Sequence, residues 1–278
     1  MRRLLIRPGA IGDFILSLPA MEHLRAAYTE VWASSPNLPL ARFADRTRSI
    51  ASTGLDLLGI PDVEPPGKLI DDLRSFDSIV SWYGANRTEF REAVERLGLP
   101  VQFLAALPET GSRLHATDFY LQQVSGAPGA VPRLPCPRGD GGYAAIHPFS
   151  GSPRKNWPLD RFLELTRLLE PLMPVLWILE PGSAGIDGAR LAPPIEDLYG
   201  LACWLARARF YVGNDSGITH LAAAAGVEVL ALHGPTDPAI WAPRGPHVRV
   251  IAPGQPGGPM TAIPLEGVLA AIPGNRPG

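Results

Sequence analysis

The residues best suited to bind a ligand or take part in a reaction follow a short apolar run, Phe210–Val212, in the second half of the chain. They are Asp215, Ser216, Gly217 and His220. A turn that opens a helix presents backbone amides with no internal partner, and the helix dipole adds positive potential there. Such an end attracts an anion, most often a phosphate. Gly217 lets the anion approach the backbone, Ser216 can donate a hydroxyl, and His220 shares that helix face one turn later.

Asp215 is harder to explain, because a carboxylate beside a phosphate is repelled. Two roles are open for it: the side chain caps the helix, or it accepts hydrogen bonds from sugar hydroxyls. Phe210–Val212 and Val227–Leu232 are predicted to be strands, and Ile218–Ala225 between them an Ala-rich helix ended by Gly226. This order is a βαβ unit, and ligands in parallel sheets sit beyond the carboxyl ends of the strands.

The apolar run Leu4–Ile6 predicts a central strand, and the loop that follows it is a second candidate for binding or catalysis. Its spacing, GxxGD, does not match the dinucleotide-binding pattern GxGxxG, but the unit marks a Rossmann-like beginning. A helix is predicted over Phe14–Tyr28, with a kink or a late start because of Pro19, since proline costs about 3 kcal/mol in a helix interior. Asp13 has two readings, the N-cap of that helix or a general base.

The rest of the chain alternates between helix and strand patterns, which predicts an α/β fold. Up to residue 126, helices are predicted over Thr47–Leu58, Leu69–Arg74, Thr88–Leu97 and Ala116–Val124, and strands over Ser78–Trp82 and Val101–Leu104. After residue 142, strands are predicted over Tyr143–Ile146 and Val175–Leu179, and helices over Leu159–Leu169, within Ile195–Ala206, and over Leu265–Ile272.

The chain length predicts two domains. A chain of 278 residues suits two cores of about 130 residues each. Residues 127–142 are rich in proline and glycine and read as a linker, so we place the boundary near residue 140, with domains at 1–140 and 141–278. The last predicted helix, Leu265–Ile272, is a candidate to pack back on the N-terminal domain.

Composition narrows the function classes. The net charge of −2 does not favour a nucleic-acid binder. Cys136 and Cys203 stand in no CxxC or Cys/His cluster, so a zinc site is not expected; free thiols are favoured, and a disulfide stays open. Met1–Ala20 imitates a signal peptide, but Arg7 and Asp13 interrupt its apolar run, and no run of about 18 apolar residues follows. We therefore expect a cytoplasmic protein.

Three segments together resemble glycosyltransferase family nine, the ADP-heptose:lipopolysaccharide heptosyltransferases. They are RPGAIGDFILSLPAMEHLRA (7–26), HPFSGSPRKNWP (147–158) and NDSGITHLAAAAGVEVLALHGPTDPAIWAPRG (214–245), with weaker similarity in HATDFYLQQ (115–123). The resemblance implies a GT-B fold, in which two Rossmann-like doubly wound parallel-sheet domains face a cleft. It places the acceptor on the N-terminal domain and the nucleotide-sugar donor on the C-terminal domain.

The resemblance also implies roles for single residues. Asp13 corresponds to the family's general base, and Lys155 to the lysine that contacts the donor diphosphate. The donor-binding residues are then Ser150, Lys155, Asp215, Ser216, Gly217 and His220. On the acceptor side we expect Gly12, Asn86 and Arg87, the last two because they follow a predicted N-terminal strand. Glu180 and Asp187 are both candidates for the carboxylate that binds the nucleotide ribose.

The implied reaction is inverting, metal-independent transfer of a heptose, or a related sugar, from ADP-heptose to a hydroxyl of a lipopolysaccharide-type glycan or glycolipid. No cofactor is expected beyond this nucleotide-sugar co-substrate, and a glycolipid acceptor implies peripheral contact with the inner membrane face. The alternative is a non-catalytic nucleotide-sugar-binding protein with a reduced acceptor domain, because the N-terminal half is shorter than is typical of the family. The missing GxGxxG pattern argues against a dinucleotide-dependent oxidoreductase.

Overall fold

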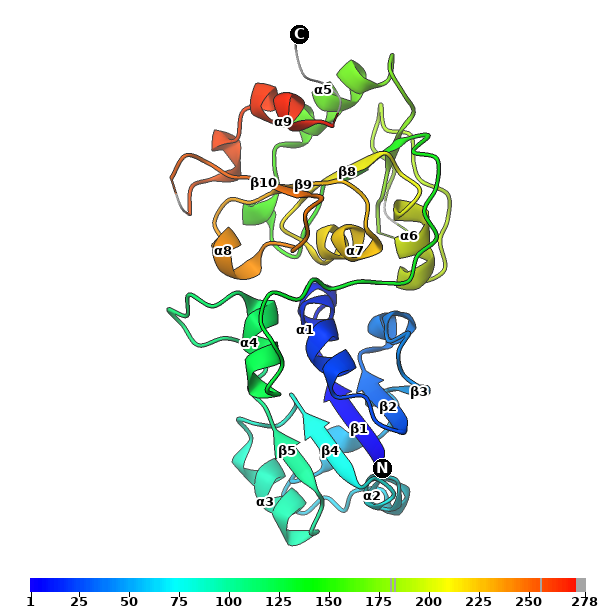
Figure 1. Ribbon diagram of the computed structural model, residues 1–278, viewed down its shortest axis with the longest axis vertical. Coiled ribbons are helices and arrows are strands. Elements are labelled where there is room, and N and C mark those ends of the chain that lie inside the picture. The colour runs from blue at the N-terminus through cyan, green and yellow to red at the C-terminus, as the bar shows by residue number, and fades with distance from the viewer. Residues whose placement is uncertain (181, 183, 256, 274–278) are drawn as a thin grey trace. The chain divides into compact units, whose positions relative to one another are not determined.

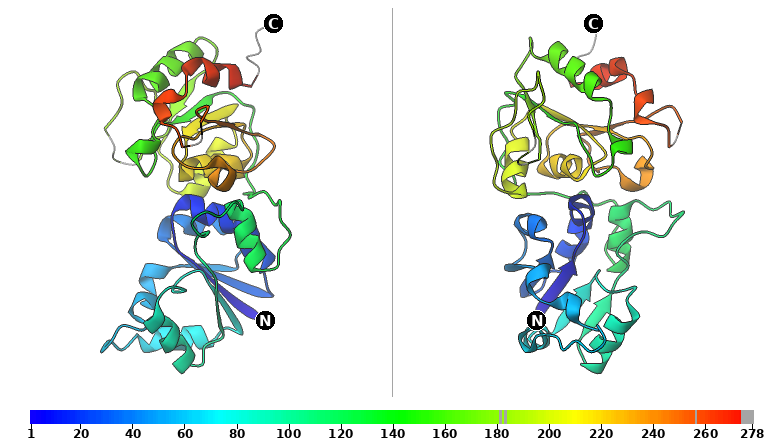
Figure 2. Two further views of the ribbon diagram at one scale, coloured as in Figure 1. Left: turned by 90° about the vertical axis from the view of Figure 1, so that its left-hand side faces the viewer. Right: turned by 180° about the vertical axis from the view of Figure 1, so that it is seen from behind.

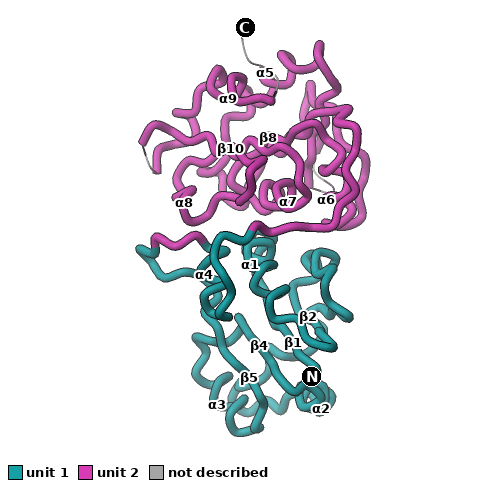
Figure 3. The backbone as a smooth tube through the Cα atoms, in the orientation of Figure 1, with its two compact units in different colours: residues 1–112, 116–130 teal, residues 113–115, 131–278 magenta. Residues whose placement is uncertain are grey.

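The computed structural model describes residues 1–180, 182, 184–255 and 257–273, and the chain divides into two compact units (Figure 3). The first unit comprises Met1–Ser112 and Ala116–Ala130, and the second comprises Arg113–His115 and Val131–Gly278. This division falls about ten residues before the boundary expected near residue 140. Linker residues 131–142 are counted with the second unit because they pack on it: the amide of Leu134 donates to the carbonyl of Ala224 at 2.8 Å.

Within the described residues, the first unit is built on a five-stranded parallel sheet in the order β3-β2-β1-β4-β5 (Figure 1). Its strands are β1 (Arg2–Arg7), β2 (Tyr28–Ala33), β3 (Arg46–Ser49), β4 (Ser78–Ser81) and β5 (Val101–Phe103). Its helices are α1 (Ile11–His23), α2 (Gly67–Arg74), α3 (Thr88–Arg96) and α4 (Ala116–Gln123), with 3-10 turns η1 (Ser35–Leu40), η2 (Ile50–Ser52) and η3 (Leu55–Leu57).

Helices cover both faces of this sheet, which is why the middle of its central strand, Leu4–Ile6, is a continuous apolar run. Leu4 and Ile6 of β1 share a core cluster with Leu69 of α2 and Phe90 of α3. On the other face, α1 packs against α4 (Figure 2). Leu5, which points away from its two neighbours in the strand, is equally buried.

Several expectations for this unit are wrong. α1 begins at Ile11 and ends at His23, so there is no late start, and Pro19 lies inside the helix. The predicted helix Thr47–Leu58 is instead the end of β3 followed by η2 and η3. Tyr28 begins β2 rather than ending a helix. The apolar pattern of β2 is broken by Glu30, but that side chain is buried and accepts a hydrogen bond from the Trp32 indole at 2.8 Å.

The second unit repeats the architecture, with a described sheet in the order β10-β9-β8-β6-β7. Its strands are β6 (Ala144–His147), β7 (Val175–Trp177), β8 (Phe210–Asn214), β9 (Val229–Leu232) and β10 (Val248–Ile251). Its helices are α5 (Leu159–Leu169), α6 (Leu198–Leu205), α7 (Gly217–Ala225), α8 (Pro238–Trp241) and α9 (Leu265–Ala271), with 3-10 turns η4 (Pro153–Lys155) and η5 (Met260–Ala262). The strands and helices predicted for this half are confirmed, and α8 and β10 are additional.

The helices of the second unit also form two layers. α5 and α9 contact each other on one face of the sheet, and α6 and α7 contact each other on the other face (Figure 1). Val268 of α9 is fully buried in a core cluster with Phe162 and Leu165 of α5. The last helix therefore belongs to the core of the second unit. Among the described residues, no helix has the length and apolar character needed to span a membrane.

Each sheet has one point at which the order of successive strands reverses. In the first unit it lies between β1 and β4, and in the second between β6 and β8. Open α/β sheets bind ligands in the crevice outside the carboxyl ends of the strands at such a switch point. The loops that follow these four strands therefore position the candidate site.

Candidate functional site

In the second unit, the loops after β6 and β8 are joined by an ion pair. Lys155 Nζ lies 2.7 Å from Asp215 Oδ2, and the Thr236 hydroxyl donates to the same oxygen at 2.5 Å. The Asp215 side chain is 7% exposed and the Lys155 side chain 31%. The carboxylate is therefore buried, whereas the lysine side chain is partly accessible to solvent. Burial alone would raise the pKa of Asp215, but His233, Lys155 and Thr236 outweigh burial and lower it. Asp215 is therefore ionised.

Helix α7 begins at the residue predicted to open an anion site, with Ser216 as its N-cap. The Ser216 hydroxyl accepts a hydrogen bond from the Thr219 amide at 3.4 Å. The capping role considered for Asp215 is therefore wrong, because its carboxylate is held by Lys155 and Thr236 instead. Asp215, Ser216, Gly217 and His220 lie together at this helix start, whose first amides have no partner within the helix.

Asn214, which the sequence analysis names only as the first residue of the segment 214–245, fixes the loop that carries Lys155. It is fully buried at the end of β8. Its side-chain oxygen accepts from the Trp157 amide at 2.9 Å, and its side-chain nitrogen donates to the Pro148 carbonyl at 2.6 Å. Both ends of the loop are thereby tied to β8. The only local signal was the amide side chain directly after an apolar strand.

Ser150 lies within the same loop and shapes it. Its hydroxyl is 2.8 Å from the Ser152 carbonyl and 2.7 Å from Asn156 Oδ1. The Ser152 carbonyl also accepts the amide of Lys155 at 2.9 Å, which closes the η4 turn. Ser150 is half-buried, and these hydrogen bonds of its hydroxyl lie within this loop.

Two buried histidines stand near the ion pair. Burial lowers the pKa of His220 to about 4. The Asp215 charge acts to raise this pKa, and His233, His115 and Lys155 lower it further. Burial also lowers the pKa of His233, whose two ring nitrogens have no hydrogen-bond partner among the described residues. Both imidazoles are therefore neutral near pH 7, so Lys155 is the cation of this cluster. Within the described ranges, no three or more His, Cys, Asp or Glu side chains are grouped to hold a metal ion.

In the first unit, Asp13 lies in the first turn of α1 and is half-buried. The N-cap of α1 is Ala10, so the capping reading of Asp13 is wrong. Arg7, 2% exposed, donates to the Asp13 carbonyl at 3.1 Å and to the Tyr120 hydroxyl at 2.9 Å. Gly9 has a φ of 122°, and a Cβ there would lie 3.7 Å from Asp13 Oδ2 and 3.8 Å from an Arg7 guanidinium nitrogen. The turn thus ties the buried Arg7 guanidinium to the backbone of Asp13 and leaves the Asp13 carboxylate beside Gly9.

The acceptor-side candidates follow β1 and β4, the strands that flank the switch point of this unit. Gly12 is the second residue of α1 and is partly exposed. Asn86 is exposed in the loop after β4, and Arg87 stands at the N-cap position of α3. The Arg87 guanidinium donates to the Tyr83 hydroxyl at 2.5 Å. Gly12, Asp13, Asn86 and Arg87 therefore belong to one sheet edge of the first unit, and the donor-side residues belong to the second unit.

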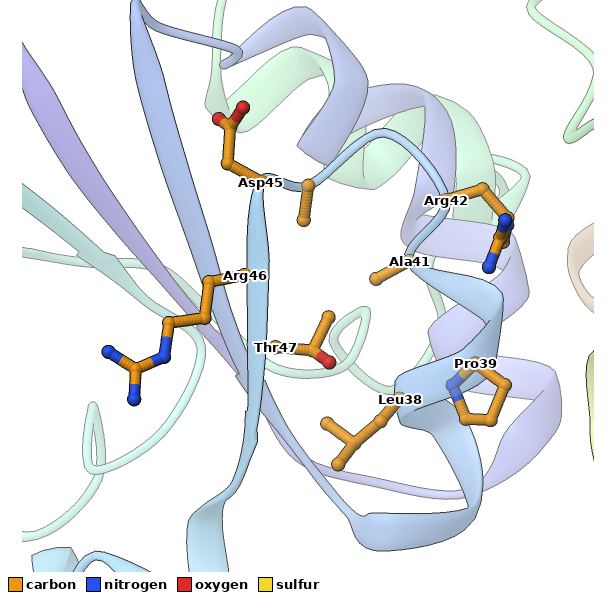
Figure 4. A pocket seen from close by; sticks show the side chains of 8 residues that line it. Leu38, Pro39, Ala41, Arg42, Asp45, Arg46 and Thr47 are labelled. Carbon is orange, nitrogen blue, oxygen red and sulfur yellow. The ribbon is translucent and has the colours of Figure 1, made fainter.

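A pocket of about 360 Å³ lies elsewhere in the first unit, beside its edge strand (Figure 4). Leu38 and Pro39 of η1 face Thr47 of β3 across it, whereas the Arg46 side chain points to the other side of the strand. The lining includes none of the predicted site residues. In each unit, the candidate residues therefore lie at the loops of its switch point and not at this hollow.

A known family matches the part of the second unit that includes the loop after β8. Residues 177–259, which run from the end of β7 to the segment before η5, match the model of glycosyltransferase family 9 (heptosyltransferase). No curated protein matches the sequence.

Solved structures match the fold along nearly the whole chain. Heptosyltransferase WaaC of E. coli with ADP has a TM-score of 0.68 and 18% identity, covering 96% of this chain and 98% of that chain. ADP-heptose LPS heptosyltransferase II of E. coli has a TM-score of 0.73 and 17% identity, covering 96% of each chain. A family 9 glycosyltransferase from Veillonella parvula has a TM-score of 0.70 and 16% identity, covering 90% of this chain and 85% of that chain.

These likenesses confirm the predicted fold class, GT-B type with two Rossmann-like parallel-sheet domains. The family match covers α7 and the Asp215–His220 segment, which carry the motif used in the sequence analysis. The family match over residues 177–259 and the shared fold therefore support the resemblance to glycosyltransferase family 9 (heptosyltransferase).

Proposed function

We propose that this glycosyltransferase is inverting and metal-independent, and that it moves a heptose or a related sugar from an ADP-linked donor to a hydroxyl of a lipopolysaccharide-type glycan or glycolipid. The observation that carries the proposal is the Lys155–Asp215 pair beside the first residues of α7. It combines a mobile cation with outward-facing amides at a switch point, as a diphosphate requires.

The donor diphosphate would take Lys155 as its counterion. Lys155 is the exposed partner of the pair, so it can turn toward a phosphate while Asp215 stays fixed by Thr236. Negative charge grows on the diphosphate as the bond to the sugar breaks, and the lysine and the α7 amides stabilise it without reorganisation. This arrangement supplies the stabilisation that a divalent metal would otherwise give.

Asp215 and His220 would bind the neutral parts of the donor. Asp215 has one oxygen engaged by Lys155 and Thr236, and its charge favours hydroxyl donors over phosphate. His220 is neutral near pH 7, so it can serve as a hydrogen-bond partner but not as a cation. Both residues therefore suit sugar hydroxyls, and Ser150, Ser216 and Gly217 complete the donor set.

Asp13 would be the general base on the acceptor. The attacking hydroxyl must lose its proton as it reaches the anomeric carbon, and a positioned carboxylate can accept that proton. A single displacement of this kind inverts the anomeric configuration, because the nucleophile enters opposite the leaving group. Gly12, Asn86 and Arg87 lie along the same sheet edge and would contact the acceptor.

The ADP-linked donor is inferred from the ligands of structurally similar proteins. WaaC has been solved with ADP and with ADP-2-deoxy-2-fluoro heptose. A glycolipid acceptor would require a cytoplasmic enzyme to contact the inner membrane face peripherally. The non-catalytic alternative remains a separate outcome of the experiment below.

The test is donor turnover by purified protein with ADP-heptose and a lipopolysaccharide-precursor acceptor, in the presence of EDTA. The wild type should release ADP and form a product of inverted anomeric configuration. Asp13→Asn should lower the rate by about 10²- to 10⁴-fold while ADP-heptose binding is retained. Glu22→Gln, which alters an exposed carboxylate of the same helix, is the control and should leave turnover unchanged.

Three results would contradict parts of the proposal. Donor binding without turnover in the wild type would favour the non-catalytic alternative. A product of retained configuration would exclude a single displacement. Full turnover by Asp13→Asn would remove Asp13 as the base.

A further inference from the structure

The two cysteines of this chain lie together, although they are 67 positions apart in the sequence. Cys136 belongs to the linker segment, residues 131–142, and Cys203 belongs to α6. Both thiols are free and half-buried, and they are in hydrogen-bond contact with each other. The proposed transfer reaction uses neither of them, so their proximity calls for a separate explanation.

The packing of the linker segment on α6 creates this contact. Tyr199 and Cys203 are four residues apart on α6, so they share one helix face. The Tyr199 hydroxyl donates to the carbonyl of Pro135 at 2.7 Å. Because Pro135 directly precedes Cys136, this bond holds the Cys136 backbone beside the helix face that carries Cys203.

Downstream of Cys136, the segment stays on α6. The Gly139 amide donates to the Ala206 carbonyl at 3.4 Å, and a Cβ at Gly139 would lie only 2.5 Å from the Cβ of Arg207. Farther on, the Tyr143 hydroxyl donates to the Trp204 carbonyl at 2.6 Å. The rings of these two residues are stacked with centroids 4.7 Å apart.

Upstream of Cys136, the Leu134 amide donates to the Ala224 carbonyl near the end of α7 at 2.8 Å. The segment is therefore anchored on both sides of Cys136. The thiol pair is a product of ordered backbone packing and not of a chance approach of two mobile side chains.

We propose that Cys136 and Cys203 are a redox-active thiol pair that closes to an intrachain disulfide by exchange with a small disulfide such as oxidised glutathione. One thiolate attacks a sulfur of glutathione disulfide, forming a mixed disulfide and releasing one glutathione thiolate. The second thiol, once deprotonated, attacks the protein sulfur of the mixed disulfide and releases the second glutathione. Two protein thiols are oxidised, one glutathione disulfide is reduced to two thiols, and the protons pass to the released glutathione.

The surroundings of the pair set a slow rate for this exchange. Burial, with the neighbouring Cys203, raises the pKa of Cys136 to about 12. The thiolate is the nucleophile in disulfide exchange, so little reactive species is present near pH 7. The pair stays reduced during brief exposure to disulfides and closes under sustained exposure.

Closure would clamp the linker segment to α6. That helix contacts α7, which carries Ser216 and His220. The new bond would close a long loop of chain, which restricts the unfolded state and raises the melting temperature. The inference concerns a covalent brace next to the candidate donor helix and does not depend on the identity of the sugar or the acceptor.

The test treats the full-length, reduced protein with oxidised glutathione and follows it by intact mass and by a peptide map without reductant. We expect one monomeric product that has lost two hydrogen atoms, with a Cys136–Cys203 linked peptide. Cys136→Ser and Cys203→Ser should each stop at a mixed disulfide carrying one glutathione. The oxidised wild type should melt several degrees above the reduced wild type, a comparison that does not rely on the variants folding equally well.

The inference is overturned if the folded wild type keeps both thiols free under sustained oxidant and they react only after unfolding. It is equally overturned if glutathione adducts accumulate separately at both cysteines, or if the product is a disulfide-linked dimer. A melting temperature that does not change on oxidation would remove the bracing role.

Discussion

At the scale of single residues, the Lys155–Asp215 pair explains how a carboxylate can stand in an anion site. The Asp215 charge is neutralised by Lys155 and further satisfied by the Thr236 hydroxyl. A buried carboxylate with one fixed partner and one mobile partner can release the mobile one to a ligand. The sequence showed these three residue types but not their contact, because they are up to 81 positions apart and meet only in the folded unit.

The buried histidine near this pair makes folding stability depend on pH. The pKa of His220 lies at about 4, below its ordinary value of 6.5. Between those values the unfolded chain binds a proton that the folded chain refuses, so stability falls as pH drops from about 7 to about 4. From pH 7.5 to pH 5, His220 alone should remove about 2 kcal/mol of unfolding free energy.

Urea unfolding of wild type, His220→Gln and His23→Gln at a series of pH values measures this effect. His220→Gln should flatten the slope of unfolding free energy against pH, whatever its uniform cost. His23→Gln changes an exposed histidine at the end of α1 and should keep the wild-type slope. An unchanged slope in His220→Gln would show that this imidazole is not held neutral by burial.

At the scale of elements, the β8–α7 junction is set by a polar network under the helix start. The Thr219 hydroxyl lies 3.0 Å from the Tyr211 hydroxyl and donates to the Asn214 carbonyl. Tyr211 and Gly213 are two residues apart in β8 and therefore face the same side of the sheet, so the tyrosine ring passes over Gly213. A Cβ at Gly213 would lie 2.2 Å from the Tyr211 hydroxyl oxygen, which explains why the second-last residue of β8 is a glycine.

Gly213→Ala should therefore displace Tyr211 and loosen the start of α7. Overpacking of this kind costs about 1–3 kcal/mol of unfolding free energy. Gly151→Ala is the matched control, because a Cβ there meets nothing within 4 Å. Chemical denaturation of both variants checks the prediction, and equal stability of the two would contradict the packing argument.

The same elements show what local sequence could predict. The βαβ unit around α7 and the helix α5 were predicted nearly residue by residue, because apolar runs, Ala-rich helix and terminal glycine all agree there. β2 and β3 were missed because Glu30, Arg46 and Arg48 interrupt the apolar pattern. In the structure Glu30 is buried against Trp32 and lies 3.5 Å from the guanidinium of Arg48. Partners from neighbouring strands, and not the local pattern, make that segment extended.

At the scale of the whole molecule, two units of the same architecture carry different chemistry at their switch points. The first unit offers a carboxylate, Asp13, whose backbone is held by the buried Arg7, and the second offers a cation, Lys155, beside a helix start. The sequence motifs place the candidate residues in loops that the fold brings to the switch points of the two sheets. They did not predict that Ser216 rather than Asp215 caps α7, or that Ala10 precedes α1, because helix starts depend on where competing side chains find partners.

The central claim is that the Lys155–Asp215 site binds the diphosphate of an adenine nucleotide sugar. The most direct measurement is calorimetric titration of the full-length protein with ADP, UDP, GDP and NAD in EDTA, repeated with Lys155→Ala and Arg154→Ala. Arg154 is the exposed neighbour of Lys155 and serves as the control.

The account predicts selective ADP binding without metal. Lys155→Ala should weaken this binding by about ten- to a hundredfold, because a charge-assisted contact is lost and Asp215 is left unpaired beside the phosphate. Arg154→Ala should bind as the wild type does. Absence of ADP binding, or equal binding by wild type and Lys155→Ala, would contradict the account.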